Sequence, residues 1–218
     1  GKGAITEPVL KKINHVSVVE IDPDMVKILK HKISTNNISI FAENILSIND
    51  EFFKKFNKII GNLPYYIATE IIFKITKNHS SEAQLYFMVQ KEVAERICEK
   101  KGSKKYGILS VLTQAYFDTQ YLFSVPASVF TPPPKVISAV IRLVRKEQIN
   151  INYNEKLFFK VVKLSFQQRR KTLRNSLKSF NLSDILREDA IFDLRPEKLS
   201  GDDFIKLTKR IEHGNISN

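Results

Sequence analysis

The chain has 218 residues, and its 43% hydrophobic and 27% charged content excludes an intrinsically disordered protein. Its one cysteine excludes an internal disulfide and is typical of a reducing compartment, so we expect a cytoplasmic protein. No run of about 18 apolar residues occurs, and we expect no membrane span. The formal net charge of +12 favours a nucleic acid partner over an ordinary soluble basic protein, which is the alternative on charge alone.

Strands and helices are predicted to alternate through the first two thirds of the chain. A β-branched run at residues 16–21 predicts a strand. The following Asp22-Pro23-Asp24 predicts a helix start, because the N–H that proline lacks would be unpaired there anyway. The other predicted elements are strands at 38–41, 58–60, 85–89 and 136–144 and helices at 68–76, 91–99 and 108–117. This alternation favours an α/β domain with a mostly parallel sheet.

A change of composition follows at residues 145–153, which are polar and show no clear period, and we place a domain boundary near residue 147. Beyond it, Ser183 and Ser200 are cap-type residues ahead of apolar positions. Short helices are expected at 155–166, 173–180, 183–188 and 201–211. The sequence therefore predicts a larger domain at 1–146 and a small helical domain at 147–218.

The chain opens with Gly1-Lys2-Gly3, a pattern that matters if it forms a turn between a strand and a helix. Glycines in such a turn let the backbone approach a nucleotide cofactor closely. Glu20 follows at about the offset at which an acid accepts hydrogen bonds from ribose hydroxyls, although a solvated strand end is the alternative. After the next strand, Asn44 offers a carbonyl oxygen to the adenine amine of a cofactor, or else forms a simple turn.

The most informative motif is Asn62-Leu63-Pro64-Tyr65, directly after a predicted strand. An adenine amine is a poor nucleophile, because its lone pair is delocalised into the ring. A side-chain amide oxygen and a backbone carbonyl can accept its two N–H bonds and so expose the lone pair to an activated methyl group. Pro64 stiffens the loop, and Tyr65 supplies a face on which a flipped base can stack. A turn with structural tyrosines is the alternative.

Several stretches occur in the order in which the small-subunit ribosomal RNA adenine-N6,N6-dimethyltransferase family carries them, and the chain resembles that family over essentially its whole length. The last three are specific to the small-subunit branch. The stretches lie at 1–6, 20–22, 62–67, 90–96, 102–107, 109–111, 129–136, 166–177 and 195–200.

The resemblance implies a fold, a reaction and a partner. The fold is α/β, with a Rossmann-like S-adenosylmethionine-dependent methyltransferase domain at 1–146 and a helical RNA-binding domain at 147–218. The reaction is dimethylation of the N6 amine of two adjacent adenosines near the 3′ end of small-subunit rRNA. It belongs to ribosome biogenesis, and we expect a monomer that acts on a pre-ribosomal particle, with no metal and no membrane.

The resemblance also implies residue roles. Tyr65 and Phe130 stack on the two faces of the target adenine. The catalytic loop is Asn62, Leu63, Pro64 and Tyr65. The cofactor-binding residues are Gly1, Gly3, Glu20, Ile21, Asn44, Ile45 and Asn62.

Two features depart from the family pattern. Members of the family carry a further upstream strand that ends in a glutamate and another glycine. Because none of this lies in the 218 residues, we expect the chain alone to lack a central strand and to have an incomplete cofactor site. Second, Asn44 stands where the family usually has an acid. Asparagine keeps an acceptor oxygen, so we expect adenine recognition to survive.

Basic residues form two clusters, which a solvated surface would also explain. The first, on a glycine-containing loop, is Lys100, Lys101, Lys104 and Lys105. The second, within 165–180, is Arg169, Arg170, Lys171, Arg174 and Lys178, and this segment has no acid. Arg170 and Arg174 are one helical turn apart, which predicts a basic face for phosphates. We predict RNA binding by Lys104, Lys105, Arg169, Arg170, Lys171 and Arg174.

Three other functions compete with this interpretation. The large-subunit RNA adenine methyltransferase branch is disfavoured by residues 129–136 and by the second basic cluster. A DNA adenine methyltransferase is disfavoured because such enzymes tend to carry Asp-Pro-Pro-Tyr in the loop. A ribosome-assembly or transcription factor of the same fold with little catalysis is disfavoured by the intact Asn62 and Tyr65.

Overall fold

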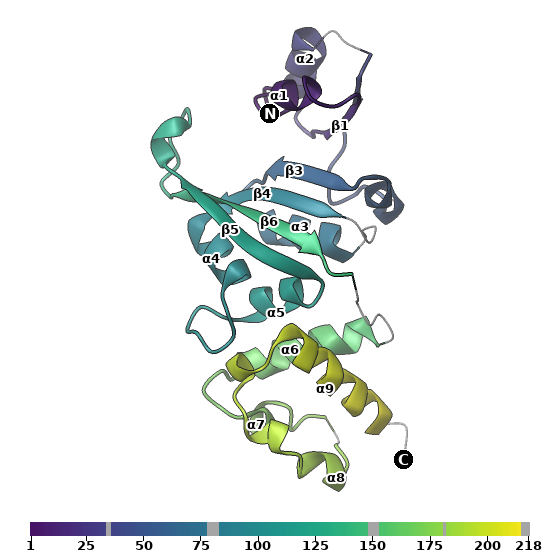
Figure 1. Ribbon diagram of the computed structural model, residues 1–218, viewed down its shortest axis with the longest axis vertical. Coiled ribbons are helices and arrows are strands. Elements are labelled where there is room, and N and C mark those ends of the chain that lie inside the picture. Colours follow the sequence, from purple (N-terminus) through teal and green to yellow (C-terminus); the bar gives the residue numbers. More distant parts are fainter. Residues whose placement is uncertain (34–35, 78–82, 148–152, 181, 215–218) are drawn as a thin grey trace. The chain divides into compact units, whose positions relative to one another are not determined.

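The structure is a computed structural model that describes residues 1–33, 36–77, 83–147, 153–180 and 182–214 (Figure 1). The chain forms two compact units. The first comprises Gly1–Lys55 and Glu70–Asn78, and the second Phe56–Thr69 and His79–Asn218. Within the described part of the chain, none of the helices combines the length and apolar character that a membrane crossing needs.

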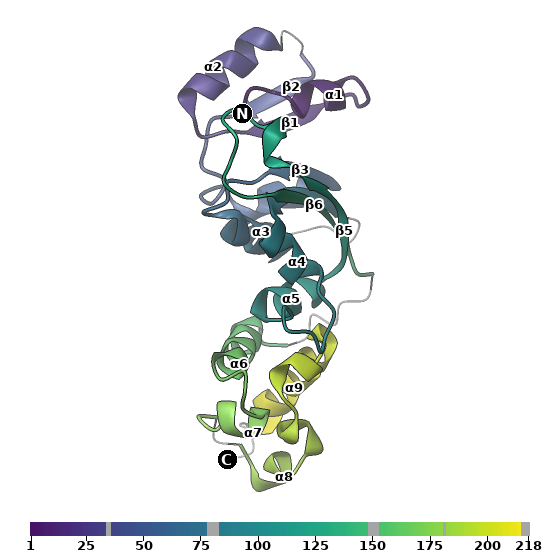
Figure 2. The ribbon, with the colours of Figure 1, turned by 90° about the vertical axis from the view of Figure 1, so that its left-hand side faces the viewer.

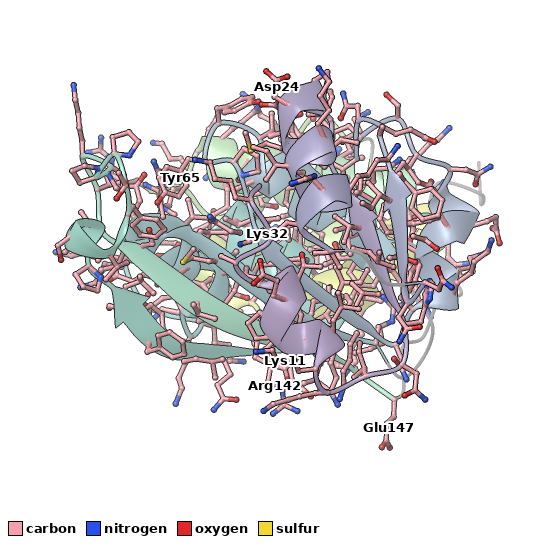
Figure 3. All side chains as sticks on the ribbon, turned by 90° about the horizontal axis from the view of Figure 1, so that it is seen from above. Lys11, Asp24, Lys32, Tyr65, Arg142 and Glu147 are labelled. Carbon is pink, nitrogen blue, oxygen red and sulfur yellow. The ribbon has the colours of Figure 1, made fainter. Side chains whose placement is uncertain are left out.

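The first unit contains a parallel pair of strands, β1 (Val16–Val19) and β2 (Ile38–Phe41). Between them, α2 (Pro23–Lys32) begins where the sequence predicts, because the Asp22 carboxylate accepts from the backbone N–H of Asp24 at 2.8 Å. Figure 3 labels Asp24 and Lys32 near the two ends of this helix. The unit also holds α1 (Thr6–Leu10) and the 3₁₀ helix η1 (Asp50–Lys55).

The second unit is built on a four-stranded sheet of order β3-β4-β6-β5. β3 and β4 are parallel, whereas β6 is antiparallel to both β4 and β5. The expectation of a mostly parallel sheet is therefore wrong for this unit, and the described strands form two sheets instead of one. The bounds are β3 Lys58–Asn62, β4 Gln84–Gln90, β5 Phe117–Val125 and β6 Ser138–Arg145.

Strand β5 is the one described strand that the sequence did not predict. Phe117, expected as the end of a helix, is its first residue, since α5 (Ile108–Gln114) ends earlier. The register shifts between Tyr121 and Phe123, so the regular alternation that identifies a strand is interrupted. An irregular strand of this kind gives a weak period-two signal.

Two helices cover one face of the four-stranded sheet, α4 (Lys91–Cys98) and α5 (Figures 1 and 2). The sheet side chains Leu85, Phe87 and Ile141 are completely buried. α3 (Ala68–Lys77) is divided between the two units. This packing holds the ends of β3, β4 and β6 in fixed register, and the catalytic motif predicted from the sequence lies at those ends.

The remaining helices belong to the same unit as the sheet. The expected domain boundary near residue 147 therefore stays a prediction, and residues 148–152 of the polar segment lie outside the described residues. Gly201 lets α9 approach α5, because a Cβ there would lie 2.8 Å from the backbone nitrogen of Ala115. The helices are α6 Glu155–Gln167, α7 Leu173–Ser176, α8 Asp184–Arg187 and α9 Gly201–Gly214, with short 3₁₀ helices at Ala127–Val129, Ala190–Asp193 and Pro196–Lys198.

Candidate functional site

The glycine turn at the start of the chain requires glycine at its third position. Gly3 has a φ of +87°, a region that L side chains rarely adopt, and a Cβ there would lie 3.1 Å from Cδ2 of Leu29. Its carbonyl oxygen accepts from the Glu7 N–H at 3.0 Å, which begins α1. Gly3 is therefore a buried residue in a tight turn beside α2, between the exposed Lys2 and Ala4.

Glu20 follows β1 and carries a hydrogen-bonded carboxylate. One oxygen accepts from the Asp22 N–H at 3.0 Å, and the other accepts from the amino terminus of Gly1. Burial raises the pKa of Glu20, but these hydrogen bonds outweigh it and lower the pKa below its ordinary value. The carboxylate is thus ionised at neutral pH and remains an acceptor. Ile21 beside it is 62% exposed, an apolar surface next to the acid.

Asn44 follows β2 at the same sheet edge as Glu20, because the two strands are parallel. Its side-chain oxygen accepts from the Leu46 N–H at 2.9 Å, and its carbonyl oxygen accepts from Ser47. The simple Asn turn considered from the sequence is therefore present. The oxygen retains a second lone pair, and Ile45 beside it is half-buried.

The Asn62-Leu63-Pro64-Tyr65 loop lies in the second unit, at the end of β3. Leu63 is buried, and its N–H donates to the Met88 carbonyl of β4 at 3.0 Å. Asn62, the last residue of β3, is exposed, and its side-chain amide has no hydrogen bond among the described residues. The loop therefore presents a free amide from an anchored backbone.

Gly61 makes this arrangement possible. A Cβ at this position would lie 2.9 Å from Cδ2 of Leu63, closer than real Cβ contacts. The absence of a side chain lets Leu63 pack beneath the strand end while Asn62 points to solvent. The predicted motif thus depends on the residue that precedes it.

Tyr65, labelled in Figure 3, is half-buried and bonded at its hydroxyl. Its oxygen lies 2.5 Å from the hydroxyl oxygen of Ser138, the first residue of β6. The neighbouring Tyr66 is 85% exposed. Sequence reasoning missed Ser138, although a single hydroxyl residue inside the apolar run at 136–144 was an available signal.

Phe130 lies in the connection between β5 and β6, in the same unit as Tyr65. It is half-buried, and its N–H donates to the Ala127 carbonyl at 3.1 Å, which closes the short turn Ala127–Val129. The expectation that Phe130 and Tyr65 stack on opposite faces of one adenine stays a prediction.

The lysine loop is the segment 99–106, which contains the first basic cluster. The structure brings it against the second basic cluster, because the Arg169 guanidinium donates to the Ser103 carbonyl oxygen at 2.9 Å. Lys105 pairs with Glu95 at 2.5 Å, and Lys101 with Asp203 at 3.6 Å. The side chains of Lys100 and Lys104 are exposed, and their amines have no partner among the described residues.

The second basic cluster differs from its prediction. α6 ends at Gln167 and α7 begins at Leu173, so Arg170 and Arg174 are not on one helix, and the predicted one-turn spacing is wrong. The Arg174 guanidinium donates to the Asp193 carboxylate at 2.8 and 3.0 Å, and to the Arg187 carbonyl oxygen. Arg170 and Lys171 are exposed and unpaired within the described part of the chain.

Comparisons with known proteins agree on one family. The family model for ribosomal RNA adenine dimethylase matches residues 1–207. A ribosomal RNA small subunit methyltransferase A of Flavobacterium johnsoniae is 52% identical over 214 residues, which cover 97% of this chain and 82% of the relative. The protein of the same name from Cytophaga hutchinsonii is 46% identical and covered to 83%.

Two solved structures are similar in fold. A dimethyladenosine transferase from Plasmodium falciparum aligns with a TM-score of 0.86 at 24% identity, over 99% of this chain and 88% of that one. The 23S rRNA methyltransferase ErmE aligns with a TM-score of 0.66 at 21% identity, over 97% and 88%. The predicted fold is thereby confirmed as a Rossmann-like methyltransferase fold with a helical C-terminal part.

Proposed function

This chain belongs to the ribosomal RNA adenine dimethylase family, and we propose that it dimethylates the N6 amine of two adjacent adenosines near the 3′ end of small-subunit rRNA. The observation that carries this proposal is the loop at the end of β3. There the Asn62 amide is exposed and unpaired among the described residues, while Leu63 and Tyr65 are both anchored.

Asn62 is the residue that engages the amine. Its side-chain oxygen accepts one N–H of the adenine amine, and a loop carbonyl accepts the other. Both bonds pull the nitrogen toward a tetrahedral geometry and expose its lone pair. No base is needed in advance, because the amine becomes acidic only as it is methylated. Pro64 restricts the loop, and Tyr65 and Phe130 hold the flipped base by stacking.

The first unit supplies the cofactor site in this proposal. S-adenosylmethionine supplies an activated methyl group on its sulfonium. Two residues of this unit fit a nucleoside-type ligand. Gly3 has a positive φ in a tight turn, and the ionised Glu20 accepts from ribose hydroxyls. In this proposal, the cofactor is also bound by Gly1, Ile21, Asn44 and Ile45 of the same unit.

The basic residues position the RNA without reading its sequence. Among those predicted, Lys104, Arg170 and Lys171 are exposed and unpaired within the described part of the chain, so they are the phosphate contacts of this proposal. Lys105, Arg169 and Arg174 are engaged by Glu95, Ser103 and Asp193, respectively, and shape the same surface. In this proposal the protein is a cytoplasmic monomer, and it binds the RNA as part of a pre-ribosomal particle.

A labelled methyl-transfer assay tests the proposal. The protein, prepared with the expected upstream strand included, is incubated with labelled S-adenosylmethionine and small-subunit particles from cells that lack this modification, and mass spectrometry of the RNA locates the product. We expect dimethyladenosine at two adjacent positions near the 3′ end. Tight particle binding without any methyl transfer would instead identify an assembly factor.

A further inference from the structure

One hydroxyl outside the catalytic loop contacts the loop directly. The Tyr65 phenolic oxygen lies 2.5 Å from the Ser138 hydroxyl oxygen, although the two residues are 73 positions apart. Ser138 is completely buried, whereas Tyr66, the residue after Tyr65, is 85% exposed. Of these two neighbouring tyrosines, only Tyr65 has its hydroxyl held by the second unit's core.

Ser138 is a rigid partner, because its backbone is fixed on both sides. It pairs with Gln90 of β4 and with Val125 of β5, in two antiparallel ladders. The preceding Ile137 adds a further bond, since its carbonyl oxygen accepts from the Lys91 N–H at 2.9 Å. Strand pairing on both sides therefore fixes the backbone and Cβ of Ser138, and its hydroxyl is completely buried.

The loop is consequently anchored at both of its ends. The Leu63 N–H is held by Met88 of β4 at 3.0 Å, and the Tyr65 hydroxyl is held by β6 at 2.5 Å. Pro64, whose φ is fixed by its ring, lies between the two anchors. An aromatic side chain whose hydroxyl is held this way has the direction of its long axis, and so the position of its ring, set before any base arrives.

We propose that Ser138 is a positioning residue for methyl transfer, which orients the Tyr65 ring for the incoming adenine. The inference rests on the proposed function of the loop, and it adds a residue from a strand on the far side of β4. Because the ring is already ordered in the free protein, less side-chain entropy is lost when the adenine binds, which favours the reactive geometry. Ser138 also ends the connection that carries Phe130, so both stacking residues are placed with reference to the start of β6.

Two substitutions remove this bond from opposite sides. Tyr65→Phe keeps the ring for stacking and loses only the hydroxyl, whereas Ser138→Ala keeps the ring and the phenol and loses the partner. We expect each to lower kcat by roughly tenfold, as the loss of an orienting hydrogen bond allows, with little change in KM for the particle. The double variant is expected to be no slower than either single variant, because one bond is lost in all three.

The controls separate positioning from stability and from the proposed function. Ser165→Ala removes another buried serine hydroxyl, which bonds the Val161 carbonyl at 2.8 Å within α6, and we expect an unchanged kcat. Ser138→Thr retains a hydroxyl and is expected to recover most of the kcat lost in Ser138→Ala. Asn62→Ala reports on the proposed function itself.

Each outcome decides the proposal. A wild-type kcat in either Tyr65→Phe or Ser138→Ala, beside an inactive Asn62→Ala, would overturn the role of Ser138 and leave the proposed function intact. Additive losses in the double variant would also overturn it. Should Ser138→Ala fail to fold, the kcat of Tyr65→Phe decides alone. An active Asn62→Ala would count against the proposed function instead.

Discussion

Arg169 donates a hydrogen bond from its guanidinium to the Ser103 carbonyl oxygen at 2.9 Å, and so joins the turn after α6 to the lysine loop 99–106. Gly102, at a φ of +95°, donates to the Glu197 carbonyl oxygen at 2.7 Å, which joins the lysine loop to the 3₁₀ helix Pro196–Lys198 as well. Arg169 and Ser103 are 66 positions apart along the chain, and their bond connects the two basic clusters.

Arg169→Gln should release the lysine loop. The guanidinium bond is charge-assisted and half-buried, so its loss is expected to speed amide hydrogen exchange in residues 99–106 by about tenfold or more. Hydrogen exchange followed by mass spectrometry measures this. Arg170→Gln is the matched control, since Arg170 is exposed and unpaired among the described residues. Equal protection in the two variants would contradict the role of Arg169.

Arg170 and Arg174 should differ in RNA binding although both are arginines of one cluster. Arg170→Gln is expected to weaken binding and to reduce the slope of log affinity against log salt by about 0.7–0.9, the value for one lost phosphate contact. Arg174→Gln should change the slope less, because Asp193 already neutralises its charge. It should instead lower the free energy of unfolding by up to about 1 kcal/mol, because the pair with Asp193 is on the surface. Filter binding across a salt series measures the first effect, and chemical denaturation measures the second. Equal salt slopes for the Arg170 and Arg174 variants would contradict the predicted difference.

Asn62→Ala should abolish methylation and leave particle affinity nearly unchanged. The side-chain oxygen acts on the reacting amine, and the loss of one such preorganised group costs about 10²–10³ in kcat. Asn36→Ala, an exposed asparagine outside the loop, is the control. Turnover and particle binding are measured together, and an unchanged turnover in the Asn62 variant would remove Asn62 from the chemistry.

Gly3→Ala should impair the first unit, because Ala is strained at a φ of +87° and its Cβ would lie 3.1 Å from Leu29. We expect a loss of about 1–2 kcal/mol in the free energy of unfolding and weaker S-adenosylmethionine binding. Gly1→Ala meets no atom within 4 Å and should be neutral for stability. Calorimetry gives both quantities, and identical behaviour of the two variants would show that the turn is not constrained.

Cys98 should be slow to react with alkylating reagents in the folded protein. Burial raises the pKa of the Cys98 thiol to about 11, although a bond from Thr119 opposes the shift. At pH 8 the thiolate fraction is therefore about two orders of magnitude below that of an ordinary cysteine. Because the folded pKa is raised, reactivity grows as the pH rises toward 11. Mass spectrometry of iodoacetamide-treated protein checks this, and unfolding in urea should restore the ordinary rate. Fast labelling of the folded chain would disprove the burial.

Local patterns predicted most elements because their signals are themselves local. Asp22-Pro23-Asp24 starts α2, since a side-chain cap and a proline act within one turn. Helix 173–180 was predicted too long, and α7 ends at Ser176. β5 was missed because its irregular register weakens the alternation. The antiparallel course of β6 between β4 and β5 involves partners distant in sequence, so a mostly parallel sheet was the wrong expectation for the second unit.

The sequence by itself determined the family, because motifs along the whole chain occur in the order of that family, and it predicted the chemistry of the loop from the residue types at 62–65. Tertiary structure alone decided which distant residues contact the loop and the basic clusters. Ser138 reaches Tyr65, Asp193 neutralises Arg174, and Arg169 holds Ser103. These pairs are separated by 19 to 73 positions, and a hydrogen bond requires two groups within about 3 Å, a condition that only the folded backbone fulfils.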